Sequence, residues 1–242
     1  MKKKVLFINQ HEKCYEDNFI SPKPAINYIP QWYKDYPKYI GENNLSSSLN
    51  DVKKGNAFPT FKNCVPFFDA FASGYMYETP CDLRVYEKNG TPVIETEPGF
   101  EDFVGFRGNQ NGFYHSDIYY SEHFYWYPFW AISTPDGYSC LYTTPLNRFD
   151  LPFTTISGII DNDKLAMTGQ YPFVLKKGFN GIIKKGTPFV QIIPIQRVQW
   201  ESSVNILGPA QLELNLSKSP FKYRRKKANV YRENDWERKH YE

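Results

Sequence analysis

Apolar residues along this chain gather in short runs of β-branched and aromatic type, separated by turn residues. Such runs are typical of strands, because branched and aromatic side chains pack well on a pleated surface. The clearest are FTTISGIID, YPFVLKK, TPFVQIIPIQRVQW and AQLELNLS. No long helical stretch lies between them, so the pattern predicts an all-β or mainly β protein. We expect a compact β-clip or jelly-roll-like domain with few short helices.

Two local patterns give sharper predictions. Residues 81–97 alternate apolar and polar positions around Asn89-Gly90, a pair that favours a type I′ turn, so they are predicted to form a hairpin. In residues 61–78 apolar side chains recur at spacings of three and four, and Gly74 follows as a stop, which predicts the main helix. A further turn is expected at Asp136-Gly137.

The pattern also divides the chain into three segments. Residues 1–58 are rich in proline and aromatic residues and are predicted to form an N-terminal arm. Residues 59–216 contain most of the strand patterns and are predicted to form the β-rich core domain. Residues 217–242 carry nine Lys or Arg and four acids, so this C-terminal arm is basic while the rest of the chain has a net charge of −2.

Composition adds an expectation about assembly. The 242 residues include 19 Tyr and 19 Phe, and aromatic residues make up 18% of the chain. Aromatic side chains are enriched at protein interfaces, so we expect a homo-oligomer or a larger assembly. The four cysteines are widely spaced, which argues against a zinc or thiol-exchange pair and favours buried, reduced thiols. We expect no signal peptide and no membrane span.

Two clusters of polar residues are candidates for metal binding. His115 and Asp117 have the His-x-Asp spacing of an iron site in 2-oxoglutarate oxygenases, because residues i and i+2 share a face of a strand. The alternative is two polar residues on the solvated face of a strand. Asp161 and Asp163 can bind Mg²⁺ through water, or can simply form the turn at a strand end.

The C-terminal arm alternates basic and aromatic residues. Three interpretations stay open: an arm that docks on a neighbouring subunit, a nucleic-acid-binding segment, and a solvated extension. The residues expected to contact a partner are Arg224, Arg225, Lys226, Lys227 and Trp236.

Two motifs resemble the dUTPase and dCTP-deaminase superfamily. Residues 158–161, GIID, are similar to its Gly-Val-Ile-Asp element, and residues 186–192, GTPFVQI, to its Gly-x-x-Ile-x-Gln strand. The resemblance implies a nucleotide site with Asp161 and Gln191 at the base and ribose, Arg148 near phosphate, and Mg²⁺ as cofactor. The superfamily's aromatic residue after the aspartate and its glycine-rich C-terminal motif are absent from this sequence.

A longer pattern resembles a family of uncharacterised proteins from tailed phages and some bacteria. Its elements are TP-x-GYS, P-x-NR, GI[IV]DxD, PF and GTPxxQxIPxxR, which match residues 134–139, 145–148, 158–163, 172–173 and 186–197. The resemblance implies a phage-type protein, found in the host cytoplasm or the virion, and implies no particular activity.

Together these patterns favour a non-enzymatic phage structural or assembly protein that makes inter-subunit contacts. The alternative is a nucleotide-binding or nucleotide-hydrolysing protein similar to dUTPases. A second alternative is an iron and 2-oxoglutarate oxygenase-like jelly roll.

Overall fold

The computed structural model describes residues 3–16, 19–108, 116–166, 169–218 and 230–242. The protein is mainly β, with 36% strand and 22% helix, as the sequence predicts. It divides into two compact units. Unit 1 comprises residues 1–28, 73–198 and 241–242, and unit 2 comprises residues 29–72 and 199–240. These units do not coincide with the three predicted segments, whose limits at 58 and 216 stay a prediction.

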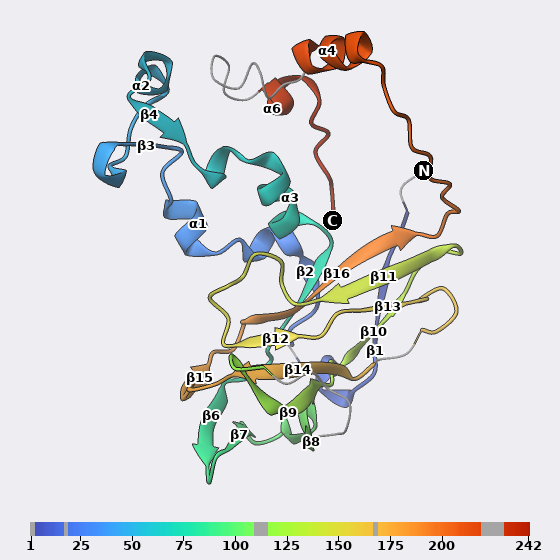
Figure 1. The fold of residues 1–242 in the computed structure, drawn as a ribbon. Coiled ribbons are helices and arrows are strands. Elements are labelled where there is room, and N and C mark those ends of the chain that lie inside the picture. The colour runs from blue at the N-terminus through green and yellow to red at the C-terminus, as the bar shows by residue number, and fades with distance from the viewer. Residues whose placement is uncertain (1–2, 17–18, 109–115, 167–168, 219–229) are drawn as a thin grey trace. The chain divides into compact units, whose positions relative to one another are not determined.

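In its described residues, unit 1 contains four antiparallel sheets (Figure 1). Its strands are β1 (Leu6–Asn9), β2 (Lys23–Pro24), β5 (Tyr75–Glu78), β6 (Leu83–Lys88), β7 (Thr91–Thr96), β8 (Val104–Gly108), β9 (Tyr119–Trp126), β10 (Trp130–Ser133), β11 (Tyr138–Thr143), β12 (Phe153–Thr155), β13 (Gly158–Ile160), β14 (Tyr171–Lys176), β15 (Gly181–Ile183) and β16 (Pro188–Gln196). Three short 3-10 helices join them: η1 (Glu12–Tyr15), η2 (Ala25–Tyr28) and η5 (Glu101–Phe103).

The two largest sheets have the strand orders β13-β11-β16-β5-β2 and β12-β14-β9-β8. A three-stranded sheet, β15-β6-β7, and the pair β1-β10 complete unit 1. The N-terminal segment contributes to this unit, because β1 pairs with β10 and β2 pairs with β5. Strands β12 and β13 are consecutive in the chain, yet each lies at the outer position of a different large sheet.

Aromatic rings from both large sheets form the hydrophobic core of unit 1. Trp126 on β9 is fully buried and stacks on Phe173 of β14, with ring centroids 3.7 Å apart. Tyr142 on β11 stacks on Tyr171 of β14 at 4.7 Å, which joins the five-stranded sheet to the four-stranded one. Burying a large apolar side chain stabilises a fold by about 2–3 kcal/mol relative to exposing it. Much of the aromatic content therefore serves the core.

The predicted hairpin at residues 81–97 is confirmed. Strands β6 and β7 pair from Leu83↔Thr96 to Lys88↔Thr91, which leaves Asn89 and Gly90 as a two-residue loop. Both loop residues have positive φ, 53° and 80°, as a type I′ turn requires. The turn at Asp136-Gly137 is also present, between β10 and β11.

The predicted helix over 61–78 is shorter than expected. Residues 61–63 form a 3-10 turn, α3 spans Val65–Ala72, and β5 begins at Tyr75. Gly74 takes a φ of +74°, a left-handed conformation that ends a helix and that glycine adopts without strain.

One predicted strand is wrong. AQLELNLS lies in a helix, α4 (Pro209–Lys218), and not in a strand. Proline is well suited to the first helical position, and leucine, glutamine and glutamate are strong helix formers. The alternation of Leu212, Leu214 and Leu216 resembled a strand, but no neighbouring strand in the described residues pairs with it.

Unit 2 is built from short elements. They are α1 (Gln31–Asp35), β3 (Tyr39–Gly41), η3 (Glu42–Asn44), α2 (Leu49–Lys54), β4 (Ala57–Pro59), η4 (Phe61–Asn63), α3, α4 and α6 (Val230–Asn234). Strands β3 and β4 pair, and Ser48 with Asp51 forms a capping box that begins α2. Tyr33 of α1 packs on Phe71 of α3 with ring centroids 5.0 Å apart.

The cysteines are free thiols, as expected, but not all are buried. Cys81 and Cys140 lie in the core, where burial raises their pKa to about 11 and about 12. Cys14 is half-buried, whereas Cys64 is exposed, contrary to expectation. Among the described helices, none combines the length and the apolar character that crossing a membrane requires.

Candidate functional site

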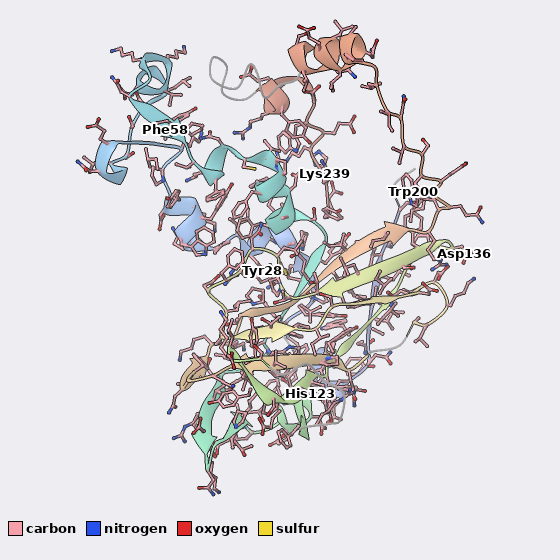
Figure 2. The ribbon with its side chains drawn as sticks, viewed as in Figure 1. Tyr28, Phe58, His123, Asp136, Trp200 and Lys239 are labelled. Carbon is pink, nitrogen blue, oxygen red and sulfur yellow. The ribbon has the colours of Figure 1, made fainter. Side chains whose placement is uncertain are left out.

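The residues of the GIIDND motif meet Arg197 at one end of the five-stranded sheet. The guanidinium of Arg197 forms ion pairs with Asp163 and, at 3.2 Å, with Asp161. Asp161 Oδ1 also accepts a hydrogen bond from Ser139 Oγ at 2.6 Å, and the Gly137 N–H donates to Asp163 Oδ2 at 2.8 Å. Three motif elements that are distant in sequence therefore meet in one charged cluster. Figure 2 labels Asp136, which lies in the turn beside it.

The ion pairs and hydrogen bonds of this cluster connect separate segments of the chain. Hydrogen bonds from the Arg197 guanidinium and the Gly137 N–H lower the pKa of Asp163 to about 2. The same pairing raises the pKa of Arg197. A guanidinium already occupies both carboxylates, and its positive charge opposes the binding of Mg²⁺ at Asp161. The arrangement thus links β11, the end of β13 and the end of β16.

Gln191 is fully buried on β16, and the protein itself uses its amide group. Gln191 Oε1 accepts a hydrogen bond from the Leu146 N–H at 2.8 Å, and Nε2 donates to the Ser73 carbonyl at 2.7 Å. A buried amide with both ends paired to backbone is typical of a structural cross-link.

Arg148 lies in the loop between β11 and β12, where its side chain is engaged locally. Its Nε donates to Asp150 Oδ1 at 2.8 Å and its Nη2 to Asp150 Oδ2 at 2.7 Å, a bidentate pair. This pairing occupies two of the N–H donors through which the guanidinium could otherwise bind a phosphate group.

The structure places Asp161 apart from Gln191. Asp161 contacts Ser139, at the start of β11, whereas Gln191 lies opposite Thr143, at its end. Four residues of strand separate these two places by roughly 13 Å. Arg148 lies in the loop after this end of β11, two residues from Leu146, whose N–H bonds Gln191. A hollow in unit 1, lined by Phe19, Pro80, Phe129 and other residues, has room for about one water molecule.

The iron alternative rests on residues that are only partly described. His115 lies outside the described residues, and Asp117 is exposed in a bend that precedes β9. Among the residues that the structure describes, no three His, Cys, Asp or Glu side chains are grouped to hold a metal ion.

The expected partner contacts of the C-terminal arm are also partly described. Arg224, Arg225, Lys226 and Lys227 lie outside the described residues. Trp236 contacts its own chain within unit 2, because its indole Nε1 donates to Asp69 Oδ2 at 2.9 Å. Lys239 forms an ion pair with the same carboxylate at 3.0 Å.

A different segment carries the most exposed apolar side chains among the described residues. The sequence pattern placed residues 198–200 at the end of a predicted strand, but β16 ends at Gln196, and no prediction singled out the segment that follows. We call residues 198–206, VQWESSVNI, the strand-like arm; they follow β16 directly (Figures 1 and 2). Trp200, Val204 and Ile206 are 88%, 92% and 90% exposed. The signal was present in the sequence, as apolar residues at every second position.

Comparison with models of protein families and with curated proteins finds no match. The fold and the contacts of the chain therefore carry the functional argument.

Proposed function

We propose that the protein is a non-enzymatic structural or assembly protein of phage type, whose strand-like arm makes contacts between subunits. The observation that carries the proposal is the exposure of Trp200, Val204 and Ile206 on one short segment. Fully burying three such side chains contributes about 5–9 kcal/mol before the entropy of ordering the arm is subtracted. Contact with another protein surface is the simplest way to remove them from water.

The state of the motif residues supports the same proposal. Asp161, Gln191 and Arg148 are the residues that a nucleotide site would use, and each has a partner within unit 1. Binding a nucleotide through them requires breaking those pairs. Their arrangement favours a role in holding the sheets together, and the longer pattern at 134–197 is in keeping with a phage protein.

The test measures self-association of the purified full chain by sedimentation velocity over a range of concentrations. We expect wild type to associate, and we expect Trp200→Ser, Val204→Ser and Ile206→Ser together to weaken association by at least about a hundredfold. The matched control replaces three polar residues of the same segment, Gln199, Glu201 and Asn205, with Ser. Wild type that stays monomeric at high concentration, or equal effects of the two triple variants, would contradict the proposal.

The nucleotide alternative is tested separately by thermal unfolding with deoxynucleotides and Mg²⁺. A specific ligand at about 100 times its Kd adds about 2.7 kcal/mol, which raises Tm by about 5–10 °C for a chain of this size. The proposal predicts no shift for any nucleotide. A shift of that size that Asp161→Ala abolishes would favour the nucleotide-binding function instead.

A further inference from the structure

We propose that the strand-like arm of one copy adds as a β-strand to the outer edge of β13, which no strand of the described residues covers, in a second copy of this chain. This inference rests on the proposed function and specifies the contact: the segment that is donated, the sheet edge that accepts it, and the backbone pairing between the two.

The donor has the side-chain pattern of a strand with one apolar face. Val198, Trp200, Val204 and Ile206 occupy every second position, with Ser202 between them, while the intervening positions are all polar. Successive side chains on a strand point to opposite faces, so an extended arm would gather these apolar residues on one side. Within the described residues, the arm belongs to no sheet. Its nine residues would span about 30 Å as a strand.

The acceptor edge follows from the position of a proline. Pro194 on β16 faces Cys140 on β11, and proline has no N–H, so this pair cannot be a hydrogen-bonded one. Pairs alternate along an antiparallel ladder, so the backbone groups of Cys140 and Tyr142 point the other way, toward β13. They meet Ile160 and Gly158 there, and the N–H and C=O of Ile159 therefore point away from the sheet.

The side chains at this edge suit the apolar face of the arm. Ile159 is 67% exposed and lies beside Leu141, which in turn lies beside Ile193. These three side chains form an apolar row across three strands on one face of the sheet. A strand added next to β13 would extend the row with Trp200, Val204 or Ile206, and cross-strand apolar pairs of this kind stabilise sheets.

The edge strands β7, β8, β15 and β12 are less suitable. Strand β7 contains Pro92 and Glu95, and β8 contains Arg107, features that protect an edge from pairing. The edge strand β15 has the same sequence as β13, Gly-Ile-Ile, but Lys184 and Lys185 follow it directly. At β12, Thr155 is 1% exposed, so its backbone is inaccessible.

The first test uses the alternation of backbone groups along a strand. Ser202→Pro and Ser203→Pro remove adjacent N–H groups, which on a strand point in opposite directions, and proline tolerates extended backbone. In an added strand only one of these groups faces the acceptor. We expect one variant to weaken self-association by about tenfold or more and the other to change it less than about twofold. Ser202→Ala and Ser203→Ala are the controls.

The second test uses the two identical edge tripeptides. Ile159→Lys should weaken association by about tenfold or more, whereas Ile182→Lys, the matched change on β15, should leave it unchanged. A photo-cross-linking phenylalanine at position 200, in a mixture of ¹⁴N- and ¹⁵N-labelled chains, should join the arm of one chain to residues 158–160 of the other. Far-ultraviolet circular dichroism establishes that each variant is folded.

The outcomes separate this inference from the proposed function. Strand addition at β13 would be overturned if Ser202→Pro and Ser203→Pro had equal effects, or if Ile159→Lys and Ile182→Lys had equal effects. Cross-links to other residues, or within one chain, would overturn it as well. The proposed function would survive each of these results as long as the serine triple variant still loses association. If that variant associates like wild type, both proposals fall.

Discussion

At the scale of single residues, Gln191 joins three parts of unit 1 through one buried amide. Gln191→Met keeps a similar volume but removes the hydrogen bonds that the amide makes to the Leu146 N–H and the Ser73 carbonyl. We expect a loss of about 2–4 kcal/mol in the free energy of unfolding, measured by urea denaturation. Gln196→Met, at an exposed position of the same strand, should change it by less than about 0.5 kcal/mol. A Gln191 that served only a ligand would show no such difference.

Asp163 gives a prediction that depends on pH. Its pairing with Arg197 lowers its pKa from the ordinary 3.8 to about 2, so the charged carboxylate stabilises the folded state above pH 4. That contribution is lost as the pH falls from about 4 to about 2, because the carboxylate is then protonated in both states. Asp163→Asn should therefore be less stable than wild type at pH 7 and equal to it near pH 2, as followed by thermal unfolding. Asp136→Asn, an exposed control in the same turn, should track wild type throughout.

At the scale of elements, Gly74 fixes the turn that leads into β5. Its φ is +74°, and a Cβ atom there would lie 1.9 Å from the carbonyl oxygen of Ile192 on β16. Gly74→Ala should therefore cost about 3–5 kcal/mol, since it adds a backbone clash to the strain of the left-handed conformation. Gly90→Ala, in the open loop of the β6–β7 hairpin, should cost only about 1 kcal/mol. Similar losses in thermal unfolding for the two variants would contradict this assignment.

The elements that could be predicted are those whose signals are local. Asn89-Gly90 specifies its turn within two residues, and most of the strand runs are strands because their branched and aromatic side chains fill one core. The extent of α3 and the nature of α4 were harder to predict. The same apolar spacing is compatible with helix and strand, and the presence of a neighbouring strand decides between them.

The candidate site was less predictable than the fold, because its meaning depends on partners distant in sequence. Arg148 and Asp150 are only two residues apart, yet the sequence predicted Arg148 near phosphate and not this pairing. Arg197 is 34 residues from Asp163, and the amide of Gln191 reaches Ser73 across 118 residues. Motif spacing singled out Asp161 and Gln191, but their partners in the fold could be found only from the structure.

At the scale of the whole molecule, aromatic content alone is a poor guide to assembly. Many of the rings counted in the sequence pack within the core of unit 1, where Trp126 contacts both Phe173 and Phe189. The better indicator is the placement of apolar side chains on a segment without a sheet of its own, which is the case for the strand-like arm. An arm that pairs with another copy should become protected from proteolysis only when two copies associate.

This dependence on concentration gives the last prediction. Chymotrypsin cleaves after exposed aromatic residues that no proline follows, and Trp200 and Phe61 are 88% and 68% exposed. Strand addition should protect Trp200 as the concentration of protein rises, whereas Phe61 lies outside the arm and should stay accessible. The ratio of cleavage at Trp200 to cleavage at Phe61, measured by mass spectrometry at early times, should fall by about tenfold between dilute and concentrated protein. Because both cleavage sites are in the same chain, a general slowing of the protease at high protein concentration affects them equally and leaves the ratio unchanged. In the Ile159→Lys variant the ratio should stay constant, and a constant ratio in wild type would show that the arm remains free.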